Sequence, residues 1–121
     1  MKTVMIVDDS KTVRSYHGSI LTSMGLNIIE AANGMEALEK SLESDIDLYL
    51  VDVNMPIMDG YTLTAELRKN NNNKTVPIIM VTTQEAEEDK ISSYKIGANF
   101  FEVKPIKPDK LKAYVELLVK S

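Results

Sequence analysis

Unbroken apolar runs, separated by helical patterns, are the feature that most constrains the fold of this chain. Residues 3–7, 48–51 and 78–81 form continuous runs that are rich in β-branched side chains. Such runs suit strands buried on both faces, as in parallel sheets. Residues 28–29 and 100–103 have the character of shorter strands or of strands at a sheet edge. The sequence therefore predicts five strands.

Apolar residues recur every three to four positions in the segments between these runs. The pattern is clearest over residues 13–24 and 111–118, and weaker over 35–42, 61–69 and 85–96. Strand and helix thus alternate along the whole chain. This alternation predicts an α/β fold, a five-stranded parallel sheet with five helices on both faces and right-handed crossovers.

Length and composition limit the classes of function. A chain of 121 residues is expected to form one domain, with no room for a second of conventional size. The net charge of -4 weighs against binding to a nucleic-acid backbone, so we expect protein partners and no direct DNA binding. Cysteine is absent and the apolar runs are too short to span a bilayer, so we predict a cytoplasmic protein without membrane insertion.

Polar residues follow the predicted strands at the points where the strands end. Asp8 and Asp9 follow the first strand, Asp52 the third, Thr82 the fourth and Lys104 the fifth. Each residue alone has an ordinary explanation, since aspartates cap helices, threonine is common in strands and lysine is usually solvated. The carboxyl ends of parallel strands nevertheless share one edge, where ligands of open α/β sheets bind. These five side chains are therefore expected to converge.

Three converging carboxylates constrain the chemistry of this edge. They repel one another unless a cation or a lysine neutralises them. Oxygen ligands without cysteine or histidine favour Mg²⁺ or Mn²⁺ over Zn²⁺. Because Mg²⁺ commonly combines one or two carboxylates with phosphate oxygens, the cluster indicates phosphoryl transfer.

The chain contains the motifs Asp8-Asp9, Val51-Asp52, Met55-Pro56, Asp59-Gly60, Val81-Thr82 and Lys104-Pro105. Together they resemble the receiver domain of two-component systems, and by architecture its single-domain, CheY-like chemotaxis regulators. The resemblance runs from Lys2 to the last helix and implies a flavodoxin-like sheet of order 2-1-3-4-5, with residues 1–121 as one receiver domain and no output domain.

The resemblance implies a role for each acidic residue. Asp52 is the expected phosphoacceptor, Asp8 and Asp9 are expected to hold Mg²⁺ directly or through water, and the backbone carbonyl of Asn54 completes the metal site. A carboxylate is a competent nucleophile, and Asp52 needs no general base because it is already ionised. The phosphoryl donor is expected to be a histidine-kinase phosphohistidine or a small acyl phosphate.

The resemblance also implies how the phosphoryl group is held and released. Thr82 and Lys104 are expected to bind its oxygens, which stabilises the negative charge of the transition state. Asn54 and Gln84 lie two positions beyond Asp52 and Thr82, where side chains tune the hydrolysis rate. The domain would thus catalyse only its own phosphorylation and dephosphorylation, and it is not expected to be an enzyme of external substrates.

A switch is expected to follow phosphorylation, since the new charge draws hydrogen-bond donors toward it. The resemblance implies that Thr82 moves toward the phosphoryl group and that Phe101 then turns inward. Many relatives have tyrosine at position 101, and phenylalanine offers no hydroxyl contact. Side-chain alternation predicts that Phe100 and Phe101 lie on opposite faces of the sheet.

A partner surface is expected on the helix after Thr82, the last strand and the last helix. Lys90 and Tyr94 lie one helical turn apart and could present the aliphatic part of the lysine and the tyrosine ring to a partner protein. Ile91 is expected to pack inward. Ile106 could add an apolar contact to the partner.

Three local features complete the expectations. The resemblance implies a cis peptide bond at Lys104-Pro105. His17 is the only histidine, lies one residue past the apolar stripe of the first helix, and is not expected to be a phosphodonor. Residues 70–73, four asparagines, are expected to form a solvated loop without function.

The function predicted from these observations is a stand-alone, monomeric response regulator. It would receive phosphate from a histidine kinase and bind a protein target in chemotaxis or motility, such as a component of the flagellar switch. An alternative is a relay intermediate that passes phosphate to a histidine phosphotransfer protein.

Other functional classes remain less favoured. A haloacid-dehalogenase-type phosphatase needs an Asp-x-Asp pair after its first strand, whereas this chain has adjacent Asp8 and Asp9. A flavodoxin-like cofactor binder would meet repulsion between these aspartates and its phosphate. A degenerate receiver that serves only as a binding module is disfavoured because every chemical residue is present.

Overall fold

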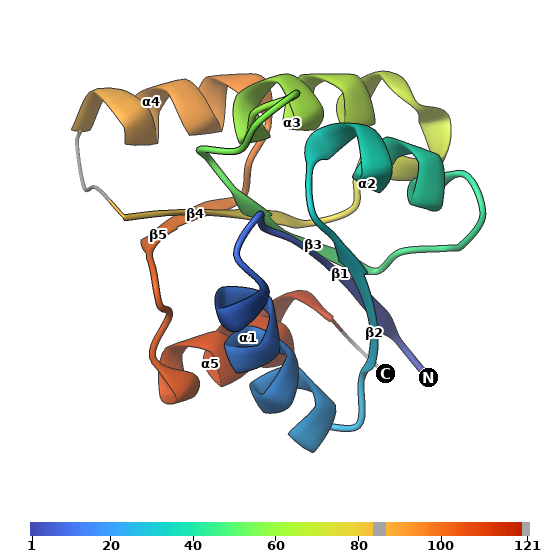
Figure 1. Ribbon diagram of the computed structural model, residues 1–121, viewed down its shortest axis with the longest axis vertical. Coiled ribbons are helices and arrows are strands. Elements are labelled where there is room, and N and C mark those ends of the chain that lie inside the picture. The colour runs from blue at the N-terminus through green and yellow to red at the C-terminus, as the bar shows by residue number, and fades with distance from the viewer. Residues whose placement is uncertain (84–86, 120–121) are drawn as a thin grey trace.

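The computed structural model describes residues 1–83 and 87–119 (Figure 1). For residues 87–89 it describes the backbone only. Within these residues, five parallel strands form one sheet in the order β2-β1-β3-β4-β5, which confirms the predicted topology. The strands are β1 (Thr3–Val7), β2 (Asn27–Ala31), β3 (Leu48–Asp52), β4 (Ile78–Thr82) and β5 (Phe100–Val103). The helices are α1 (Lys11–Ser23), α2 (Gly34–Ser41), α3 (Gly60–Lys69), α4 (Glu87–Ile96) and α5 (Pro108–Leu118), with a short 3₁₀ helix, η1 (Asn71–Asn73).

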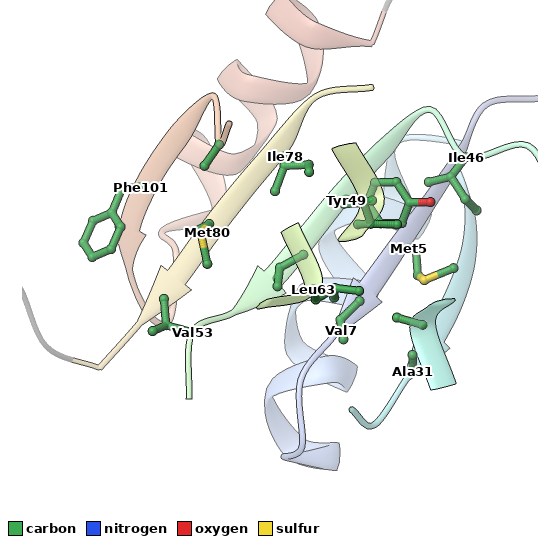
Figure 2. Packing of buried hydrophobic residues seen from close by; sticks show 14 residues of the cluster. Met5, Val7, Ala31, Ile46, Tyr49, Val53, Leu63, Ile78, Met80 and Phe101 are labelled. Carbon is green, nitrogen blue, oxygen red and sulfur yellow. The ribbon is translucent and has the colours of Figure 1, made fainter. Parts of the chain in front are cut away.

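The helices cover both faces of the sheet, with α1 and α5 on one face and α2, α3 and α4 on the other (Figure 1). Alternate side chains of each strand therefore enter two different cores. Met5 and Tyr49 pack toward α2 and α3 with the cluster drawn in Figure 2, whereas Ile6 and Leu50 pack toward α1 and α5. Strands β3 and β4 are buried along their whole length, as their unbroken apolar runs predict.

Side-chain caps begin the three helices α1, α2 and α3. The Ser10 hydroxyl accepts a hydrogen bond from the Val13 N–H, and the Asn33 side chain accepts one from Glu36. The Asp59 carboxylate in the same way accepts from the Thr62 N–H. Each bond satisfies an N–H group that has no partner within its helix. The loop that carries Asp8 and the loop that follows Asp52 are therefore each held at the end that meets a helix.

The asparagine run at residues 70–73 is solvated only in part: Asn71 and Asn72 are exposed, as predicted, but residues 71–73 form η1 and Asn73 departs from the prediction. Asn73 is buried, and its side-chain oxygen accepts a 2.7 Å hydrogen bond from the hydroxyl of the fully buried Tyr49. A tyrosine hydroxyl inside a core requires a partner. The Arg68 guanidinium also donates to the Asn73 carbonyl at 2.9 Å. Only the end of the run, Asn73, is therefore part of the interior beside Tyr49.

The start of the predicted helix over residues 85–96 lies outside the described residues, and the helix is described from Glu87. Among the residues that are described, no helix is both long enough and apolar enough to cross a bilayer.

Candidate functional site

The predicted site residues meet at the carboxyl edge of the sheet. Asp8 follows β1 directly, Asp52 ends β3, Thr82 ends β4, and Lys104 follows β5. The register pairs Asp52 with Val81 across β3 and β4, so these ends lie level with one another. Asp8, Asp52 and Thr82 are each at most 3 % exposed. The sheet thus buries two carboxylates and a hydroxyl at one point.

Three carboxylates lie close enough to share a cation. One oxygen from each of Asp8, Asp9 and Asp52 lies within 4.8 Å of the other two, with Asp9 on the solvent side. Asp8 Oδ1 accepts from the Ser10 N–H at 2.8 Å, and Asp52 Oδ1 accepts from the Asn54 N–H at 3.4 Å. Among the described residues, the buried Asp52 Oδ2 has no hydrogen-bond partner. A buried carboxylate oxygen of this kind is a ready ligand for a cation.

The Lys104 ammonium lies between the two buried carboxylates. Its Nζ is 3.2 Å from Asp8 Oδ2 and 3.3 Å from Asp52 Oδ2. The Lys104 backbone N–H donates to the Thr82 carbonyl at 2.7 Å, which fixes the start of its loop against β4. Burial opposes the charge on the lysine, but the Asp52 and Asp8 carboxylates raise the pKa of Lys104 overall. The lysine is therefore a permanent cation in the site.

The electrostatics of the site leave negative charge in excess. Burial and the neighbouring Asp8 raise the pKa of Asp52 to about 6 from 3.8, and the Lys104 ammonium offsets only part of this effect. A raised pKa means that the ionised carboxylate is costly in its surroundings. An added divalent cation would remove that cost, and the all-oxygen ligand set suits a hard ion such as Mg²⁺ or Mn²⁺.

Gly60 allows the β3–α3 loop to close over Asp52. A Cβ atom at position 60 would lie 2.4 Å from the Asp52 carbonyl oxygen, far inside any real contact. The Gly60 N–H donates to the Val53 carbonyl at 2.9 Å, which holds the start of α3 against the end of β3. The glycine is therefore needed for close approach of two backbones.

Arg14 is a site neighbour that the sequence analysis missed. Its Nη1 donates to the Asp8 carbonyl at 2.6 Å, and its Nε pairs with the Glu30 carboxylate at 2.9 Å. These bonds tie the loop of Asp8 and Asp9 to β2. A cation one turn into the helix that follows two aspartates is the one signal that could have indicated this role.

The aromatic pair of β5 divides between the two cores, as predicted. Phe101 is 5 % exposed and belongs to the cluster under α2 and α3, beside Met80 (Figure 2). Phe100 packs on the other face against Tyr114, with ring centroids 4.6 Å apart. Phe101 already lies inward in this state. The peptide bond at Lys104-Pro105 is cis, also as predicted.

The expected partner surface requires two corrections. Ile91 is 52 % exposed, whereas Ser93 is fully buried, so α4 packs through a small residue and turns Ile91 outward. Ile106 is 1 % exposed and packs in the core under α1 and α5, so it is not a surface contact. Tyr94 is half exposed and Lys90 partly so, which leaves both on an accessible face. Gln84 lies outside the described residues.

Comparison with known proteins assigns the family. The family model described as response regulator receiver domain matches residues 4–116. The chain belongs to this family. The resemblance inferred from its motifs is thereby confirmed.

Curated relatives of this receiver domain include chemotaxis proteins. It is 36 % identical over 118 residues to chemotaxis protein CheY1 of Helicobacter pylori, covering 96 % of this chain and 95 % of that protein. Protein PilG of Pseudomonas aeruginosa is 31 % identical, with 98 % and 87 % covered. The probable transcriptional regulator ycf27 of Cyanidium caldarium is 36 % identical over 97 % of this chain, which spans about half (46 %) of that protein's length. The same domain thus occurs alone and as part of longer proteins.

Solved structures of other receivers agree with the fold. Chemotaxis protein CheY4 of Vibrio cholerae superposes with a TM-score of 0.93 at 34 % identity, covering 98 % of this chain and 99 % of that one. The response regulator TrrA of Thermotoga maritima, in complex with Mg²⁺ and BeF, has a TM-score of 0.87 at 33 % identity, covering 98 % and 100 %.

Proposed function

We propose that this receiver domain accepts a phosphoryl group on Asp52, in a site that Mg²⁺ completes, and that phosphorylation changes its affinity for a protein partner. The observation that carries the proposal is the state of Asp52 Oδ2. This oxygen is buried, has no hydrogen-bond partner among the described residues, and lies 3.3 Å from the Lys104 ammonium. It is thus placed to act on a ligand rather than to stabilise the fold.

The residues present fit a hard divalent cation. One oxygen from each of Asp8, Asp9 and Asp52 lies within 4.8 Å of the other two, and the backbone carbonyl of Asn54 is proposed as a further ligand. When bound, Mg²⁺ or Mn²⁺ neutralises the carboxylates and the negative charge of the phosphoryl group. The complex of the TrrA relative with Mg²⁺ and BeF supports this choice of metal.

In the proposed reaction, a carboxylate oxygen of Asp52 attacks the phosphorus of the donor. A P–O bond to Asp52 forms while the bond from phosphorus to the leaving group breaks, which is P–N for a phosphohistidine and P–O for an acyl phosphate. The Lys104 ammonium and the Thr82 hydroxyl donate to the phosphoryl oxygens. Water later attacks the phosphorus, which restores the Asp52 carboxylate and releases inorganic phosphate.

A histidine kinase is the proposed donor. The sensor histidine kinase CheAY of Helicobacter pylori contains a stretch that is 36 % identical to 97 % of this chain, which supports a pairing between this domain type and such kinases. The target is proposed to be a protein in chemotaxis or motility, as the likeness to CheY1 and CheY4 supports. The monomeric state and the cytoplasmic location stay predictions.

The output surface is proposed to lie on α4, β5 and α5. Tyr94 and Ile91 are about half exposed on α4 and offer apolar area, with Lys90 beside them. A movement of Thr82 toward the phosphoryl group is proposed to alter the packing around Phe101, and with it this surface. Loss of Asp52 phosphorylation would then leave the surface in its resting form.

Intact-mass spectrometry tests the proposal. The protein is incubated with acetyl phosphate, with and without Mg²⁺, beside an Asp52→Asn variant. We expect a mass gain of one phosphoryl group in the wild type with Mg²⁺, and no gain in the variant or with a chelator. The proposal fails if the wild type gains no phosphate or if Asp52→Asn gains it equally.

A further inference from the structure

Two side chains of helix α1 form hydrogen bonds with the backbone of Ile106 in the β5–α5 loop, one with its carbonyl and one with its N–H. The Tyr16 hydroxyl donates to the Ile106 carbonyl at 3.1 Å. The Ile106 N–H donates to Nε2 of His17 at 3.2 Å. His17 and Ile106 are each 1 % exposed, so no solvent competes with the second bond. Tyr16 and His17 of α1 therefore fix the backbone of Ile106, which is distant from them in sequence.

The loop that contains Ile106 also contains Lys104. Ile106 lies two residues after Lys104, and the ring of the intervening Pro105 restricts its backbone φ angle. The loop is fixed at Lys104 by the hydrogen bond from its N–H to the Thr82 carbonyl. It is fixed at Ile106 by the hydrogen bonds to Tyr16 and His17. The Ile106 side chain is also packed in the core. The path of the backbone at Lys104 is thus determined from both sides.

The same helix also carries the acidic loop. Ser10 caps α1, and its N–H donates to the Asp8 carboxylate at 2.8 Å. Asp8 in turn lies 3.2 Å from the Lys104 ammonium. Helix α1 therefore fixes the acidic side of the site through its first residues and the lysine side through Tyr16 and His17.

We propose that Tyr16 and His17 form a positioning clamp on Ile106 that sets the reach of the Lys104 ammonium toward Asp52. Neither residue touches the reacting atoms, so both are positioning residues. The inference rests on the proposed function, because it concerns the placement of Lys104 for phosphoryl transfer to Asp52.

The clamp demands one chemical form of His17. To accept from the Ile106 N–H, Nε2 must carry its lone pair, and the neutral ring must therefore hold its proton on Nδ1. Burial lowers the pKa of His17, the charge of Lys104 lowers it further, and the Asp8 carboxylate opposes the shift. The surroundings thus favour the neutral acceptor. The Tyr16 ring packs edge to face against the imidazole of His17, with ring centroids 5.2 Å apart.

A matched set of variants separates positioning from simple core filling. His17→Leu fills the space but leaves the Ile106 N–H buried without an acceptor. In His17→Gln, the side-chain carbonyl oxygen can accept the hydrogen bond from the Ile106 N–H in place of Nε2. The rate constant for phosphorylation of Asp52 by acetyl phosphate with Mg²⁺ is expected to fall on the order of tenfold in His17→Leu, because small misplacements of catalytic groups are costly. It should return toward the wild-type value in His17→Gln.

A double-mutant cycle tests whether His17 acts through Lys104. In a Lys104→Met background, His17→Leu should cause little further loss of rate, since the group that it positions is absent. The clamp is overturned if the Leu and Gln variants are equally slow, or if His17→Leu slows the reaction by the same factor in both backgrounds. If His17→Leu does not fold, Tyr16→Phe, which removes one hydroxyl, replaces it in the same cycle.

A spectroscopic measurement decides the geometry independently of phosphorylation. His17 is the single histidine of the chain, so its ring nitrogens give one set of ¹⁵N signals in untagged protein. We expect an unprotonated Nε2 and a protonated Nδ1 at neutral pH, and a protonated Nε2 would overturn the clamp. Failure of the wild type to become phosphorylated would instead overturn the proposed function, so the two failures are distinct.

Discussion

Lys104 Nζ forms an ion pair at 3.3 Å with Asp52 Oδ2, an oxygen that has no hydrogen-bond partner in the described part of the chain. The lysine is shared with Asp8 at 3.2 Å, so one positive charge faces two buried negative ones. The pair is therefore incomplete as a structural ion pair and open to a further ligand. Its energetic imbalance leads to the predictions that follow.

Asp52→Asn is expected to stabilise the metal-free protein at pH 7. The pKa of Asp52 is raised to about 6 from 3.8, so the folded state disfavours its ionised form, and stability is lost as the pH rises through this range. Removing the charge should raise the free energy of unfolding by about 2–3 kcal/mol at pH 7 and by far less at pH 3.5, where the aspartate is largely protonated in both states. Urea denaturation with a chelator at both pH values measures this. An equal gain at both would show that the charge is not the cause.

Mg²⁺ is expected to stabilise the wild type by relieving the same repulsion. At a concentration of one hundred times its Kd, a ligand that binds only the folded state adds about 2.7 kcal/mol to the free energy of unfolding. Asp8→Asn should remove most of this gain, whereas Asp45→Asn, at an exposed position away from the site, should retain it. Thermal unfolding with MgCl₂, and with NaCl at equal ionic strength, separates binding from screening. A similar gain in both variants would contradict a metal site at Asp8.

Gly60→Ala is expected to destabilise the protein by about 1–3 kcal/mol or more, because its Cβ would lie 2.4 Å from the Asp52 carbonyl oxygen. Gly18→Ala is the matched control. Its Cβ would meet only the Ile6 Cδ1, at 3.7 Å, and it lies inside α1. Alanine there should stabilise the protein by about 0.5–1 kcal/mol. Chemical denaturation of both variants measures the contrast, and similar changes in the two would refute the close approach.

The sequence was sufficient to predict the sheet and the centre of the site. Long buried strands leave unbroken apolar runs, and residues directly after such runs must share the carboxyl edge of a parallel sheet. Asp8, Asp52, Thr82 and Lys104 could be placed together for this reason, without any knowledge of their contacts. The family motifs added the strand order, which alternation alone does not determine.

The supporting residues were beyond prediction because their roles depend on tertiary packing. The orientation of α4 decides that Ile91 is exposed, and the weak apolar pattern of that helix does not indicate its inner face. Asn73 is buried because Tyr49 requires an acceptor from a distant segment. The side chain of His17 lies one position past the apolar stripe, yet it is buried against Ile106. Local periodicity carries no record of such long-range partners.

His17 is expected to give the protein an acid-sensitive component of stability. Its pKa is lowered in the folded state by burial, so below about 6.5 the unfolded chain binds the proton first, and stability falls as the pH drops. Asp52 contributes the opposite trend between pH 6 and 4, so the wild type alone does not isolate the histidine. The free energy of unfolding should therefore be compared between the wild type and His17→Gln from pH 7.5 to 5. We expect the wild type to lose stability relative to the variant as the pH falls, whereas a constant difference would mean that His17 does not titrate differently in the two states.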